Sequence, residues 1–206
     1  MNALIVVDVQ NDFLPGGSLA VPNGDAIIPI INKLSKNFDL VVATQDWHPD
    51  GHSSFASQHD GKEAFEQIDL NGNKQTLWPD HCVQGSYGAE FNEKLNMNSV
   101  ESIFRKGTDL KIDSYSGFYD NNHDKSTALA DYLRGKNVDE VYICGLAADV
   151  CVYFTALDAL REKFSTYIIT DATKGLDEKA ITADFDDIKQ RGGKLIEAKD
   201  LNLSKL

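Results

Sequence analysis

The chain has 206 residues, 42% of them hydrophobic, which suits a single α/β domain spanning residues 1–206. Acidic residues outnumber basic ones by 32 to 20, the formal net charge is −12, and the basic residues do not cluster, which excludes a nucleic acid as partner. The apolar run that follows Met1 is too short for a signal peptide or a membrane span, so we expect a cytoplasmic protein whose three cysteines form no disulfide framework.

Short apolar runs alternate with helical patterns along the chain, and such runs are typical of buried strands. In chain order, strands are expected at 3–7, 40–43, 100–104, 141–144, 167–169 and 194–197, and helices at 25–36, 127–133, 149–163 and 179–191. This alternation predicts a doubly wound, mostly parallel β-sheet with helices on both faces. Ligands bind beyond the carboxyl ends of the strands in such sheets. The residues expected there are Asp8, Asp46, Lys106 and the turn at Cys151.

Cys151 follows a strand and a turn of small residues, at the start of the expected helix 149–163. The positive end of a helix dipole favours a thiolate, and free backbone N–H groups at such a turn can receive an oxyanion. The sequence therefore indicates a nucleophile at Cys151, with a small buried core residue as the alternative interpretation.

Two charged residues complete a candidate set for nucleophilic catalysis. Asp8 ends a very apolar strand, where partial desolvation raises the pKa of a carboxyl group and suits it to proton transfer. Lys106 precedes a glycine after the strand 100–104, and a cation there stabilises a thiolate. The alternatives are a surface or capping aspartate and an ordinary solvated lysine.

A carboxylate and several imidazoles form a candidate metal site. Asp46 and His48 lie two residues apart, and in an extended chain their side chains share one face. His52 follows four residues after His48, and His81 lies in the segment WPDHC (78–82). This donor set suits one divalent ion, with Zn expected first and Fe or Mn as alternatives. Histidines in loops without any ligand are the competing interpretation.

Aromatic residues gather near these points and predict a flat pocket for a ring, although core packing is the commoner role of such residues. They are Phe13, Trp47, Trp78, Tyr115 and Phe118.

Six segments together resemble the nicotinamidase branch of the isochorismatase-like hydrolases, in order and over most of the chain. They are VDVQNDFLPGGSL (7–19), TQDWHP (44–49), WPDHCVQG (78–85), KG (106–107), DSYSGF (113–118) and GLAADVCV (145–152). Isochorismatase itself lacks the cysteine nucleophile, so Cys151 argues for the amidase branch. Ala148 departs from the threonine that many relatives carry at this position.

The resemblance implies a catalytic triad of Asp8, Lys106 and Cys151. It implies that Asp46, His48 and His81 bind the metal, with His52, Ser53 or Ser54 left open as a further ligand. It also implies a cis peptide bond between Leu146 and Ala147, and an oxyanion hole formed by the N–H groups of Ala147 and Cys151. The substrate pocket is then expected to contain Phe13, Leu19, Trp78 and Tyr115.

The implied reaction is hydrolysis of nicotinamide, and of pyrazinamide, to the acid and ammonia through a cysteine thioester, in NAD salvage. Two alternatives stay open: a related amidohydrolase acting on another small amide or carbamoyl substrate, and a non-catalytic metal-binding module on the same fold. The segment after Lys174 matches only loosely and carries no expected site residue. Whether the chain forms a homo-oligomer is not decided by any interface patch in the sequence.

Overall fold

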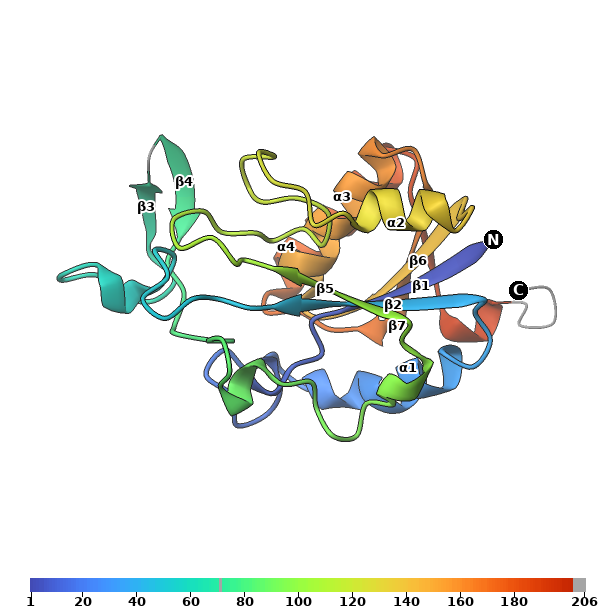
Figure 1. Cartoon of the computed structure of the whole chain (residues 1–206), viewed down its shortest axis with the longest axis horizontal. Coiled ribbons are helices and arrows are strands. Elements are labelled where there is room, and N and C mark those ends of the chain that lie inside the picture. The colour runs from blue at the N-terminus through green and yellow to red at the C-terminus, as the bar shows by residue number, and fades with distance from the viewer. Residues whose placement is uncertain (71, 202–206) are drawn as a thin grey trace.

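A six-stranded parallel sheet runs through the molecule in the order β5-β2-β1-β6-β7-β8 (Figure 1). The computed structural model describes residues 1–70 and 72–201. The strands of the sheet are β1 (Asn2–Val7), β2 (Leu40–Asp46), β5 (Ser102–Lys106), β6 (Glu140–Gly145), β7 (Ser165–Thr173) and β8 (Lys194–Ile196). A separate antiparallel hairpin is formed by β3 (Gln67–Leu70) and β4 (Asn73–Thr76).

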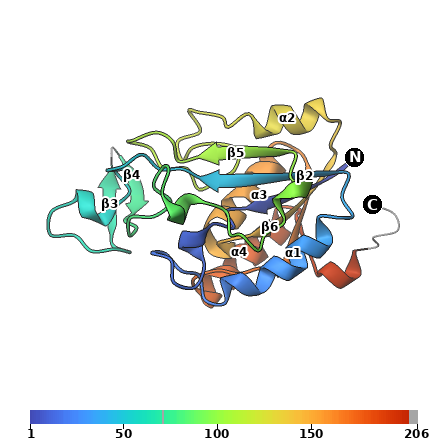
Figure 2. The same cartoon turned by 60° about the horizontal axis from the view of Figure 1, so that its bottom comes forward.

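Helices cover both faces of the sheet, as the alternating pattern predicts. Figure 2, which turns the molecule, shows α1 (Ile28–Leu34) on one side of the strands and α2 (Leu129–Gly135) on the other. With α2 lie α3 (Tyr153–Arg161) and α4 (Glu178–Gln190), whose apolar residues join the same core cluster. Short 3-10 turns occupy Asn11–Phe13, Gly24–Ile27, Ala56–Gln58, Tyr87–Ala89, Met97–Ser99 and Ala198–Asp200.

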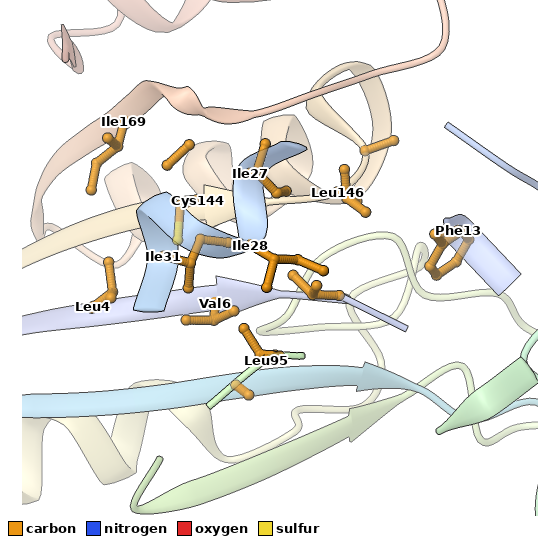
Figure 3. Close-up of a cluster of buried hydrophobic side chains, with 14 of the residues drawn as sticks. Leu4, Val6, Phe13, Ile27, Ile28, Ile31, Leu95, Cys144, Leu146 and Ile169 are labelled. Atoms are coloured by element: carbon orange, nitrogen blue, oxygen red, sulfur yellow. The ribbon is translucent and has the colours of Figure 1, made fainter. Parts of the chain in front are cut away.

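The central strand β1 is buried on both faces, which explains its uninterrupted apolar sequence. Its side chains alternate between the two cores: Leu4 and Val6 join the cluster beneath α1, and Ile5 joins the cluster beneath α2 and α3. Figure 3 shows Leu4 and Val6 against Ile28 and Ile31 of α1. Two packed layers therefore hold β1 at the centre of the sheet and fix where its carboxyl end lies.

All six expected strands and all four expected helices are present, with shifted bounds. Because β2 continues to Asp46 and β5 to Lys106, these two residues end their strands instead of following them. The expected helix 149–163 begins as a π-helical turn, Ala148–Val152, before α3. The β3–β4 hairpin was not predicted, since seven of its eight residues are exposed or half-buried and give no apolar run. Within the described part of the chain, no helix has the length and apolar character needed to cross a membrane.

Candidate active site

Four adjacent parallel strands deliver side chains to one edge of the sheet. Asp8 directly follows β1, and Asp46 and Lys106 end β2 and β5, where the strand register pairs them. Cys151 lies in the π-helical turn after β6, the other neighbour of β1. Because neighbouring parallel strands end at the same edge, residues far apart in sequence meet here.

The ammonium group of Lys106 lies at the centre of this meeting point. Its Nζ is 2.9 Å from Asp8 Oδ2, 3.0 Å from Asp46 Oδ1 and 3.4 Å from Cys151 Sγ. It also donates to the carbonyl oxygen of Ser114 at 3.0 Å. The side chains of Lys106 and Asp8 are fully buried. The structure thus brings the three residues of the expected triad into contact, with one cation between two carboxylates and a sulfur.

Burial shifts the pKa of each of these groups. It raises the pKa of Asp8, and the lowering effect of Lys106 does not cancel this. It likewise raises the pKa of the Cys151 thiol well above its usual range, with Lys106 opposing and the two carboxylates adding to the rise. Burial thus opposes the thiolate that the helix start is expected to favour. The Lys106 ammonium persists because Asp46 and Asp8 outweigh the effect of its burial and raise its pKa.

A metal-binding geometry adjoins the triad. One ligand atom each from Asp46, His48 and His81 lies within 4.8 Å of the others, and all three residues are buried. The two Nε2 atoms face Asp46 Oδ2, at 3.3 Å from His48 and 3.5 Å from His81. Two imidazoles and a carboxylate are a donor set that suits Zn²⁺ and similar ions and leaves positions open for water or substrate.

The opposite ring nitrogens hold both imidazoles in this orientation. Nδ1 of His48 lies 3.0 Å from the carbonyl oxygen of Gly107, and Nδ1 of His81 lies 2.7 Å from that of Pro79. Donation from Nδ1 leaves Nε2 with its lone pair directed at the cluster, as in known metal sites. Among the described residues, buried His48 Nε2 forms no hydrogen bond, although Asp46 Oδ2 lies near it, and this arrangement fits a nitrogen that binds a cation. At Gly107, φ is +63° and a Cβ would lie 2.5 Å from the His48 ring, so only glycine allows this approach.

The residues that the sequence leaves open as further metal ligands, His52, Ser53 and Ser54, form hydrogen bonds of their own. Ser54 engages His52 twice: its hydroxyl lies 2.8 Å from His52 Nδ1, and its N–H donates to the same atom at 3.2 Å. The N–H of Ser53 donates to the carbonyl oxygen of Leu110. His48, His52 and Asp113 form a second group of candidate metal ligands, and within the described residues neither His52 Nε2 nor Ser53 Oγ forms a hydrogen bond, so His52, Ser53 and Ser54 stay open as further ligands.

A pocket of about 370 Å³, its open mouth included, lies between Asp46 and His81 on one side and Cys151 on the other. Aromatic and aliphatic side chains wall it, and Cys151, Ala147, Asp46 and His81 reach it as well. All four residues expected to bind substrate are among its lining residues: Phe13, Leu19, Trp78 and Tyr115. A mostly apolar wall with a few polar groups is typical of a site for a small molecule.

Hydrogen bonds from two directions fix the aromatic wall. The hydroxyl oxygen of Tyr115 accepts from Trp78 Nε1 at 3.3 Å and from Gln75 Nε2 at 3.0 Å. Gln75 is the one buried residue of β4 and also donates to Asp113, so the unpredicted hairpin supports the pocket.

Some expectations about the pocket were wrong, and some of its residues were missed. The guanidinium carbon of Arg105 lies 3.9 Å from the centroid of the Trp47 ring. Phe118 is fully buried in the core. Neither aromatic residue lines the pocket. An aromatic side chain near a motif gives no signal of which way it points. The lining residues not expected from the sequence are Val21, Asp113, Val150 and Leu176.

The turn before the nucleophile has the expected backbone. The peptide bond between Leu146 and Ala147 is cis. The N–H of Leu146 donates to the carbonyl oxygen of Val7, and that of Val152 to the carbonyl oxygen of Ala147. Ala147 and Cys151 both line the pocket.

Comparison with known proteins agrees with this geometry. The isochorismatase domain family model matches residues 2–200. A nicotinamidase of Acinetobacter baylyi is 51% identical over 85% of this chain and 82% of its own length. The solved structure of a nicotinamidase/pyrazinamidase from Acinetobacter baumannii has a TM-score of 0.95, 48% identity and 97% coverage of both chains. That of a Pyrococcus horikoshii pyrazinamidase in complex with zinc has a TM-score of 0.78 and 42% identity, covering 95% of this chain and 98% of the other.

Proposed function

The chain belongs to the isochorismatase domain family, and on this premise we propose that it is a nicotinamidase, hydrolysing nicotinamide to nicotinic acid and ammonia. The observation that carries the proposal is the contact of the Lys106 ammonium with both Asp8 and Cys151, where Cys151 lines a pocket with aromatic walls. The match over residues 2–200 also supports one domain over the whole chain.

We assign Asp8 as general base and acid, Lys106 as the cation that steadies the charges, and Cys151 as nucleophile. Asp8 takes the thiol proton, since the carboxylate and the sulfur lie within 4.8 Å. The sulfur attacks the carboxamide carbon, and the N–H groups of Ala147 and Cys151 stabilise the oxyanion that forms. The C–N bond breaks as Asp8 returns the proton to the amide nitrogen, which leaves as ammonia.

Hydrolysis of the thioester uses the same groups in the second half of the reaction. Asp8 removes a proton from an incoming water, and the hydroxide oxygen bonds to the acyl carbon. The C–S bond then breaks, nicotinic acid leaves, and the sulfur recovers the proton from Asp8. Because burial raises the pKa of Asp8, the group holds a proton more readily than an exposed aspartate and can pass it in both directions.

A divalent metal ion is the cofactor, and we propose that Asp46, His48 and His81 bind it and that it is zinc. The donor set supports zinc, as does the zinc complex of the Pyrococcus relative. When bound there, the ion would supply Lewis acidity beside the pocket. Phe13 and Trp78 offer aromatic surfaces for the ring, and Leu19 and Tyr115 complete the wall.

The experiment is ammonia release from nicotinamide by the purified zinc-loaded protein. Wild type is expected to turn over, and Cys151→Ala to lose at least 1000-fold in kcat, on the order of what loss of a nucleophile costs. Cys144→Ala is the matched control, because Cys144 is buried in β6 away from the pocket. A Cys151→Ala protein that keeps most of the wild-type rate contradicts the assignment.

A related amidohydrolase with another substrate is the alternative, and rates on nicotinamide, pyrazinamide and aliphatic amides separate the two. Bound metal with no ammonia release from any amide supports a non-catalytic module.

A further inference from the structure

The loop that follows β7 reaches the candidate active site, although the sequence gave no site residue after Lys174. Leu176 lies in this loop and lines the same pocket as Cys151 and Trp78. It is partly buried and packs against the core cluster that contains Phe13 and Ala147. The C-terminal part of the chain therefore contributes directly to the walls that a substrate would meet.

Asp149, in the π-helical turn Ala148–Val152 that contains Cys151, holds this loop in place. Its Oδ1 accepts the backbone N–H of Leu176 at 2.9 Å, and its Oδ2 accepts that of Asp177 at 2.8 Å. A backbone hydrogen bond from Ala148 to the carbonyl oxygen of Lys174, 2.8 Å long, runs beside them. Both oxygens of one carboxylate thus bind consecutive N–H groups, two residues before Cys151.

The loop closes on this carboxylate because residue 175 is glycine. A Cβ at Gly175 would lie 2.4 Å from Asp149 Oδ1 and 2.9 Å from the Cβ of Ala148. Any side chain there would push the loop from the turn, and Leu176 with it. The small side chain of Ala148 leaves room for the same approach.

The pocket has two kinds of wall. Phe13, Trp78 and Tyr115 are aromatic, whereas Leu176 belongs to an aliphatic group with Leu19, Val21 and Val150. An aromatic side chain can stack on the face of a substrate ring whether or not the edge of that ring carries a substituent. An aliphatic side chain in van der Waals contact with the ring excludes a substituent, because closely packed groups cannot move aside without a cost in free energy. The discrimination between rings with and without substituents therefore depends on the aliphatic group.

Resting on the proposed function, we propose that Leu176 is a specificity-determining residue of this enzyme, and that Asp149 is the positioning residue that holds it against the substrate ring. Leu176 excludes ring-substituted carboxamides, and Asp149 couples that exclusion to the turn that carries the nucleophile. Loss of either side chain widens the pocket at one place and leaves the triad in its position.

The test compares kcat/KM for nicotinamide, 5-methylnicotinamide and 6-methylnicotinamide in the zinc-loaded enzyme. The Leu176→Ala substitution is expected to raise the ratio of kcat/KM for the better methylated amide to kcat/KM for nicotinamide at least tenfold. A methyl group that does not fit an apolar pocket changes kcat/KM by roughly 10- to 200-fold. A ratio within twofold of wild type, with nicotinamide turnover retained, overturns the proposal. Failure of wild type to hydrolyse nicotinamide overturns the proposed function instead.

The role of Asp149 is tested by the same ratio. Asp149→Ala, or the milder Asp149→Asn if the first variant folds poorly, is expected to raise it in the same direction. The double variant with Leu176→Ala is expected to show no greater rise than Leu176→Ala alone, because both changes act through one side chain. Asp177→Ala, which removes the cap of α4 but keeps the backbone N–H, is the control and leaves the ratio unchanged. Equal losses on all three amides would show a merely structural role for Asp149 and contradict this part.

Discussion

Replacing Lys106 by methionine removes the one ammonium group that lies between Asp8 and Asp46. The variant keeps the length and most of the volume of the side chain, but two carboxylates in a fully buried cluster lose the cation that lies 2.9 Å and 3.0 Å from them. Loss of one partner from a buried ion pair costs about 3–5 kcal/mol, because the remaining charge stays buried and uncompensated. We therefore expect the free energy of unfolding to fall by that amount.

Urea denaturation of the metal-free proteins measures this loss, since bound metal would add its own stabilisation. Lys62→Met is the matched control: the Lys62–Glu66 pair is exposed, with side-chain accessibilities of 43% and 40%, and its loss is expected to cost about 0.5 kcal/mol or less. If unpaired charge is the cause, adding Asp8→Asn to Lys106→Met recovers part of the stability. A loss under about 1 kcal/mol for Lys106→Met, or a double variant less stable than the single one, would refute the reasoning.

Three further predictions concern Asp46, Gly107 and Asp184. Asp46→Ala is expected to lower bound metal at least tenfold in elemental analysis, and near-normal metal content would contradict the ligand assignment. Gly107→Ala forces the His48 ring aside, so weaker metal binding with little change in the fold by circular dichroism is expected. Burial and the neighbouring Asp149 and Asp187 raise the pKa of Asp184 to about 6, so its charge costs stability above that pH and nothing below its unfolded value of 3.8. Asp184→Asn should then raise Tm by roughly 1–3 °C at pH 7.5, a small gain because the group is partly screened, and leave it unchanged at pH 3.5.

The architecture and the meeting of the triad could be predicted because they depend on short-range signals. Apolar runs place the strands, and parallel strands ending at one edge bring Asp8, Lys106 and Cys151 together. The proximity of Asp46 and His48 could be predicted for a similar reason, because side chains two residues apart in an extended chain share one face.

The parts that were missed depend on long-range packing. Leu176 lines the pocket because a carboxylate 27 positions earlier holds its backbone, and no local pattern around either residue indicates that contact. Trp47 and Phe118 stand in motifs but point to Arg105 and the core. The effect of burial on the pKa of Cys151 could not be predicted from the sequence, because burial beside two carboxylates is a property of the folded site.

Mass spectrometry of the enzyme, acid-quenched during turnover of nicotinamide, tests the central assignment most directly. A nicotinoyl group on the peptide that contains Cys151, absent from the Cys151→Ala protein, is the predicted result. Acylation of Cys82 or Cys144 in its place, or unmodified cysteines together with full turnover by Cys151→Ala, would contradict the account.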